Sequence, residues 1–112
     1  MPFLTIHTNS DVKDSKLFLN EVATFVAGEL HKPINYVIAD LKVNKNMIFG
    51  GDETIKSALV ELKSVGFGDK ADLASKLTDF LADKLDASKS FINIHFVNMP
   101  ASDLSIGGRM LG

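Results

Sequence analysis

Hydrophobic and polar residues alternate in four segments of the chain, which is the pattern of half-buried β-strands. These segments cover residues 2–8, 36–43, 57–65 and 91–97. The third segment, SALVELKSV, is also compatible with a helix, because most of its residues are good helix formers. We interpret it as a strand because Ala58, Val60 and Leu62 fall on one face, with Glu61 and Lys63 on the other.

Two longer segments have the period of an amphipathic helix. In residues 12–30 the apolar positions are Leu19, Val22, Ala23, Val26 and Leu30. In residues 70–88 they are Leu73, Leu77, Leu81 and Leu85, with Phe80 beside them. The residues 9–11, Asn-Ser-Asp, supply capping chemistry for the first helix. Pro33 predicts that this helix ends near residue 31, because the residue before a proline is disfavoured in the helical region.

The predicted order is β-α-β, a connector with a turn at residues 44–46 and a short extended piece, and then β-α-β again. The two strands of each β-α-β unit should be parallel. Two such halves related by a pseudo-twofold give an α+β fold, with a four-stranded mixed sheet and both helices on one face, in one domain over residues 1–112. Arg109 to Leu111 is a candidate last short strand.

The second face of this sheet has no predicted cover. One layer of two helices covers one side of a sheet, and an apolar face left open indicates a contact with another molecule. Apolar side chains on the open side would come from Ile38, Leu59, Val65, Phe91 and Val97. We therefore expect an oligomer of this chain.

Composition excludes several classes of function. The formal net charge is −2 with mixed signs, so neither nucleic acid nor an anionic membrane is an expected partner. No apolar run approaches the length of a membrane span, and residues 1–11 lack a signal-peptide pattern, which predicts a cytoplasmic protein. The absence of cysteine excludes disulfides and thiolate catalysis. The three histidines, His7, His31 and His95, have no partner at ligand spacing, so no metal site is expected.

Pro2 opens the first predicted strand, and this residue has two interpretations. A proline is tolerated at the start of a strand, because no ladder hydrogen bond is required there. If Met1 is removed, however, the ring nitrogen of Pro2 becomes a free secondary amine, which is both a base and a nucleophile. The first eight residues alone favour the structural interpretation.

Several short motifs occur in an order that is specific when they are taken together. They are proline at position 2, KPINY at residues 32–36, FGG at residues 49–51 and NM at residues 98–99. With the doubled β-α-β pattern at this length, the chain resembles macrophage migration inhibitory factor and its relatives in the tautomerase superfamily. The resemblance extends over the whole chain.

This resemblance implies a homotrimer whose three sheets form a barrel around a central channel, with active sites between neighbouring subunits. It also implies a cofactor-free keto–enol tautomerase acting on small carboxylated compounds of the phenylpyruvate and dopachrome type. The residue that matches the family's catalytic base is Pro2. An amine in an apolar pocket near a cation has a lowered pKa, and a base is most effective when its pKa lies near the working pH.

Four further positions match residues of the family's substrate pocket. Lys32 matches a lysine that binds the substrate carboxylate, although a lysine here also suits the end of a helix. Val65 matches a position whose backbone N–H holds the same carboxylate. Tyr36 lines the pocket in this comparison or is an interface tyrosine, and Phe3 lies at the pocket rim or packs in the core.

The chain departs from the family pattern at the positions that a neighbouring subunit would contribute. Asn93 and His95 stand on the strand that carries a tyrosine and an asparagine in the vertebrate proteins, so a hydroxyl is missing; His95 either replaces a polar partner or is structural. Ile106, Met110 and Leu111 replace an aromatic wall with an aliphatic one.

These departures leave a second function open. The chain would then be a binding or cytokine-type signalling protein with a weak tautomerase site, and export without a signal peptide would accompany that role. Hydratase or dehalogenase chemistry is disfavoured, because those relatives use additional arginines and this chain has Arg109 alone.

Overall fold

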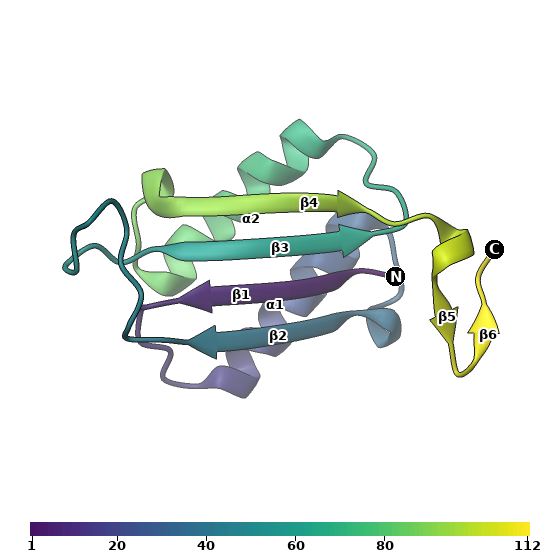
Figure 1. The fold of residues 1–112 in the computed structure, drawn as a ribbon, viewed down its shortest axis with the longest axis horizontal. Coiled ribbons are helices and arrows are strands. Elements are labelled where there is room, and N and C mark those ends of the chain that lie inside the picture. The colour runs from purple at the N-terminus through teal and green to yellow at the C-terminus, as the bar shows by residue number, and fades with distance from the viewer.

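The computed structural model describes residues 1–112 as one four-stranded sheet, two helices packed on it and a small C-terminal hairpin (Figure 1). The elements of the main body are β1 (Phe3–Thr8), α1 (Ser15–Leu30), β2 (Ile38–Val43), β3 (Ala58–Ser64), α2 (Lys70–Leu85) and β4 (Ile92–Asn98). The hairpin consists of β5 (Ser105–Ile106) and β6 (Arg109–Met110).

The strand order β2-β1-β3-β4 reproduces the predicted pseudo-twofold. Strand β1 is parallel to β2, β3 is parallel to β4, and the two halves meet where β1 and β3 run antiparallel. Both helices lie on the same face of the sheet (Figure 1). The predicted α+β class, mixed sheet and single helical layer are therefore confirmed.

The core lies between the helices and one face of the sheet. The alternating strands bury Leu4 and Ile6 from β1 and Val60 and Leu62 from β3. The predicted leucines of the second helix are all buried: Leu73, Leu77, Leu81 and Leu85. In α1 the prediction was partly wrong, because the buried set is Phe18, Val22, Val26, Ala27 and Leu30, whereas Leu19 and Ala23 are only half-buried.

Helix α1 begins later than the sequence predicted, at Ser15 with Asp14 as its cap. The Asp14 carboxylate accepts a hydrogen bond from the Leu17 N–H at 3.0 Å, which satisfies one of the unpaired donors of the first turn. Residues 9–11, which the sequence predicted as caps, do not cap the helix. The Asn9 side chain donates to the Met47 and Ile55 carbonyls and so ties down the connector between β2 and β3.

Strands β2 and β4 begin later than predicted, because a 3₁₀ turn precedes each of them; β2 is two residues shorter, whereas β4 is shifted by one residue and ends at Asn98. These turns are Ile34–Tyr36 and Lys89–Phe91, so Tyr36 and Phe91 are not strand residues. Each turn follows a helix that ends in the same way, with His31 and Asp86 in the left-handed conformation at φ of 54° and 51°. The two halves thus share their connections as well as their strands.

The C-terminal residues form a hairpin that extends beyond the end of the sheet (Figure 1). The predicted strand at Arg109 pairs with Ser105–Ile106, a partner that the sequence pattern had not indicated. Gly107 and Gly108 both have positive φ, as a tight two-residue hairpin turn requires. Neither long helix has the length and hydropathy needed to span a bilayer.

The open face of the sheet carries the predicted apolar groups only in part. Ile38 and Leu59 are more than half exposed, whereas Val65, Phe91 and Val97 are half-buried. Between them lie polar residues such as Thr5, Glu61 and His95, which are neighbours in the strand register. This face is therefore mixed in character.

Leu77→Ala should lower the free energy of unfolding by about 3 kcal/mol, since the side chain is 0% exposed and its removal leaves a cavity. Leu17→Ala is the matched control, because Leu17 is 55% exposed in the other helix and should cost less than about 1 kcal/mol. Urea unfolding of both variants at one protein concentration measures the difference. Equal losses would contradict the assigned core.

Candidate active site

Lys32 is placed by the way in which helix α1 ends. His31 takes the left-handed conformation, and the Lys32 N–H then donates back to the Ala27 carbonyl at 2.9 Å. Such a closing bond satisfies one of the last free carbonyls of the helix. The chain leaves the helix axis at Pro33. Lys32 therefore lies at the end of the sheet where strand β3 ends.

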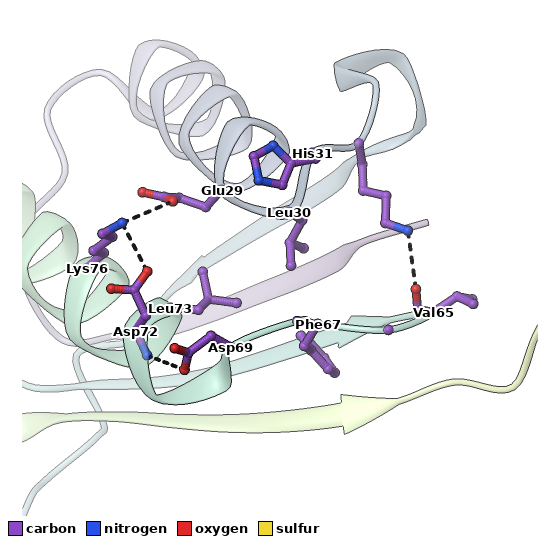
Figure 2. Close-up of a pocket in the computed structure, with 12 residues that line it drawn as sticks. Glu29, Leu30, His31, Val65, Phe67, Asp69, Asp72, Leu73 and Lys76 are labelled. Atoms are coloured by element: carbon purple, nitrogen blue, oxygen red, sulfur yellow. Dashed lines mark hydrogen bonds and ion pairs between the residues drawn. The ribbon is translucent and has the colours of Figure 1, made fainter.

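The Lys32 ammonium meets the end of strand β3. Its Nζ donates to the Val65 carbonyl at 3.3 Å, the dashed line at Val65 in Figure 2. Val65 lies one residue beyond β3, and the following Gly66 N–H is fixed by the Asn98 side chain at 3.1 Å. The structure therefore brings together two of the predicted site residues from different halves of the fold.

These residues form one wall of a pocket of about 520 Å³ between the end of α1, the loop after β3 and the start of α2 (Figure 2). Three of the other charged side chains in the pocket pair with one another. Lys76 Nζ lies 3.0 Å from the Asp72 carboxylate and 3.8 Å from that of Glu29. Asp72 and Glu29 accordingly raise the pKa of Lys76.

Lys32 differs from Lys76 in having no ion pair. Its recorded hydrogen bond is to the neutral Val65 carbonyl, at a length close to the upper limit for such a bond. The counterpart of Lys32 after helix α2 is Ala87, whose N–H makes the same closing bond, to Ala82. The cation is thus a feature of one half of the fold, and it remains available to an anionic ligand.

Pro2 lies at the same end of the sheet. Its carbonyl accepts the Ile38 N–H at 3.1 Å, which extends the β1–β2 ladder by one residue. The β1–β3 register pairs Phe3 with Lys63, so one further residue places Pro2 opposite Ser64, immediately before Val65. The Pro2 side chain is fully buried.

The pKa of the Met1 amino group reflects the electrostatic environment of the N-terminus. Burial lowers the pKa of this group below its usual value, and the positive charge of Lys32 lowers it further. Both causes disfavour a second cation beside Lys32. Pro2 does not line the pocket of Figure 2, so in one chain the buried proline lies beside the wall formed by Lys32 and Val65 and not inside the pocket.

Tyr36 and Phe3 lie near this end in different settings. Tyr36 is 46% exposed on the 3₁₀ turn before β2, so its ring is free to contact a ligand or another chain. Phe3 is half-buried on the open face of the sheet, where Ile38 and Lys63 are its strand neighbours. Phe3 is not part of the hydrophobic core cluster.

The remaining predicted residues are not brought to Pro2 within one chain. Asn93 and His95 are exposed on the open face of β4, at the sheet edge beyond β3. His95 Nδ1 lies 3.7 Å from the Glu61 carboxylate. Ile106 and Met110 are exposed on the projecting hairpin. A site containing all of these residues would need more than one copy of the chain.

Comparison with known proteins identifies the fold family. The family model described as macrophage migration inhibitory factor (MIF) matches residues 1–112. The chain belongs to the macrophage migration inhibitory factor family. A MIF homolog from Brugia malayi is 37% identical over 116 residues, covering 100% of both sequences.

Solved MIF structures have the same architecture. The structure of MIF from Trichinella spiralis matches with a TM-score of 0.87 and 31% identity, covering 96% of this chain and 98% of that one. A MIF homologue from Prochlorococcus marinus gives 0.88 at 25% identity, with 98% and 99% covered. The predicted resemblance to the MIF family and the tautomerase fold are therefore confirmed.

Sequence reasoning missed two features of this region. One is the ion-pair cluster of Glu29, Asp72 and Lys76, of which only the spacing of Asp72 and Lys76 within α2 could have been noticed. The other is Ser64, which lies buried opposite Pro2. A serine at the end of an alternating strand gives no signal of its own for such a position.

Proposed function

We propose that this MIF-family protein is a cofactor-free keto–enol tautomerase acting on small carboxylated substrates, with Pro2 as its general base. The observation that carries this proposal is the contact of Lys32 with Val65 beside Pro2: a cation without an ion pair stands next to a buried proline. Family membership supports the same chemistry.

The reaction requires one proton to move between oxygen and carbon. In the enol-to-keto direction, the neutral Pro2 amine takes the proton of the enol hydroxyl and an ammonium ion forms. The same proton is then delivered to the adjacent carbon, which restores the amine and leaves the ketone. Substrate and product are isomers, so no electrons are exchanged and no cofactor is needed.

Lys32 and Val65 bind the carboxylate in this proposal. A charge-assisted hydrogen bond from the Lys32 ammonium replaces its long bond to the Val65 carbonyl, and the Val65 N–H provides a second donor. The positive charge also favours the neutral form of a nearby amine. Lys32 therefore serves both binding and the basicity of Pro2.

The working unit in this proposal is a homotrimer with sites between subunits. Ile106 and Met110 would cover the site with an aliphatic wall, and Asn93 and His95 would come from a neighbouring chain. Tyr36 and Phe3 would lie at the rim. The exposed apolar residues of the projecting hairpin support an assembly in which another copy covers them.

Lys32→Ala should raise KM for phenylpyruvate by about 10- to 100-fold with a smaller change in kcat, because a charge-assisted bond to the carboxylate is lost. Lys84→Ala is the matched control: Lys84 stands in the last turn of the other helix and pairs with Glu21. The measurement is the steady-state enol-to-keto rate, after mass spectrometry has shown that Met1 is absent.

Unchanged kinetics in Lys32→Ala would remove this residue from the site and favour its alternative role at a helix end. In that case Lys32→Ala should lower only the free energy of unfolding, by the few tenths of a kcal/mol, up to about 1 kcal/mol, that a cation near a helix end contributes. A wild-type trimer without measurable turnover would contradict the tautomerase proposal and favour a binding or signalling role.

A further inference from the structure

Ser64 is the last residue of strand β3, and its hydroxyl is buried without a hydrogen-bond partner. The residue is 0% exposed, and no group in the structure bonds to its Oγ. Its backbone carbonyl is satisfied, since it accepts the Met99 N–H at 2.8 Å. Because buried polar groups are nearly always paired, the unpaired hydroxyl calls for a physical explanation.

The neighbour of Ser64 across the sheet is Pro2. Strands β1 and β3 pair Phe3 with Lys63 on the open face, so the next residues, Pro2 and Ser64, face the helices together. Both are fully buried. Side chains directly opposite each other in an antiparallel pair have Cβ atoms about 5 Å apart, which puts the serine hydroxyl within reach of the proline ring.

The hydrogen-bonding capacity of the Pro2 nitrogen depends on whether Met1 is attached. With Met1 attached, this nitrogen is a tertiary amide, which has no N–H to donate and whose lone pair is delocalised into the carbonyl. Removal of Met1 converts it to a secondary amine, which both donates and accepts. Only in the processed chain can this nitrogen serve as a hydrogen-bond partner for the Ser64 hydroxyl.

We propose that Ser64 is a positioning residue for the N-terminal base: once Met1 is removed, its hydroxyl hydrogen-bonds to the Pro2 ring nitrogen and fixes its direction. This inference rests on the proposed function, because it assigns Ser64 a role through Pro2. Ser64 itself does not contact the reacting atoms.

The bond also affects the basicity of the amine. A serine hydroxyl accepts from the N–H of an ammonium and donates to the lone pair of a neutral amine. The bond to the charged form is roughly twice as strong, so Ser64 raises the pKa of the Pro2 amine. Its effect opposes burial and Lys32, which both act in the other direction on the amino group at this end.

Other titratable groups face this end of the chain from the neighbouring elements. They are Lys32 and His31 after α1, Tyr36 before β2 and Lys63 on the opposite face of β3. Of these, only Lys32 acts on the Met1 amino group. The other buried hydroxyl residues, Thr8, Ser10 and Ser57, belong to the far end of β1 and β3. Ser64 is therefore the one buried hydroxyl beside Pro2.

The test measures the pKa of the Pro2 amine directly, by ¹⁵N NMR titration of proline-labelled protein from which Met1 has been removed. Ser64→Ala should lower this pKa by about one unit. The acid limb of the kcat/KM profile should move to lower pH by the same amount. Ser64→Thr keeps the hydroxyl and should restore the wild-type value.

Ser57→Ala is the matched control. Ser57 directly precedes the same strand, is 1% exposed and also has an unpaired hydroxyl, yet it lies at the far end from Pro2. It should leave the pKa unchanged. A Ser64→Ala protein with the wild-type pKa would overturn the inference while a tautomerase activity dependent on Pro2 could still stand. A shifted pKa in a protein without turnover would support the Ser64–Pro2 bond and contradict only the proposed function.

Discussion

Inserting one alanine between Met1 and Pro2 is expected to lower the tautomerase kcat of the processed protein by about 10²- to 10⁴-fold, the usual contribution of a general base. The insertion leaves every side chain in place but makes the Pro2 nitrogen an amide, which cannot accept the enol proton. KM should change little, because Lys32 still binds the carboxylate. Steady-state assay of phenylpyruvate enol-to-keto turnover measures both constants.

Pro2→Ala is the companion variant, since it keeps an amine at the same position without the proline ring. It should retain more activity than the insertion variant, because a primary amine there is still a base. Wild-type kcat in the insertion variant, with the oligomer intact, would refute Pro2 as the base. A rise in KM at constant kcat would indicate a blocked pocket and not lost chemistry.

The main elements of the fold were predictable because their patterns are long. Leucine at every fourth position from Leu73 to Leu85 leaves few alternatives to a helix with one buried face, and the structure buries all four leucines. The starts of β2 and β4 were predicted too early. The 3₁₀ turns before these strands end in Tyr36 and Phe91, which are aromatic and therefore common in strands, so residue type does not separate these two positions from the strands that follow.

The predicted start of α1, at residue 12, was wrong for a different reason. Asp11 and Asp14 are both good capping residues, and their local sequences do not decide between them. Tertiary contacts favour Asp14: the Asn9 side chain bonds to the connector between β2 and β3, and the Asp11 carboxylate pairs with Lys45 Nζ at 2.6 Å, so both residues are held outside the helix. Such competition is invisible in a single sequence.

The candidate site was predictable only where a family motif marks it. Lys32 and Pro2 carry the resemblance, and the fold then brings Lys32 to Val65 from the other half of the chain. The position of Ser64 depends on the register of two strands far apart in sequence, together with its complete burial. Neither property follows from the alternation of residues along one strand.

Truncation after Asp103 is expected to convert the proposed trimer to a folded monomer and to lower kcat/KM by at least about a hundredfold, because misplaced binding groups cost that much. The truncation removes the exposed apolar residues Ile106, Met110 and Leu111. The core cluster should survive, since none of its residues lies beyond Ile92. Sedimentation equilibrium measures the assembly, and far-UV circular dichroism measures the fold.

A full-length variant carrying serine at Ile106, Met110 and Leu111 should behave as the truncated chain does, which separates the loss of apolar contact from the loss of length. Leu17→Ser is the control: Leu17 is 55% exposed on the helical layer, away from the hairpin, and its replacement should leave assembly and activity unchanged. A truncated chain that remains trimeric would exclude the hairpin as the contact between copies. A truncated monomer with full activity would place the complete site within one chain, and Asn93 and His95 would then have no part in catalysis.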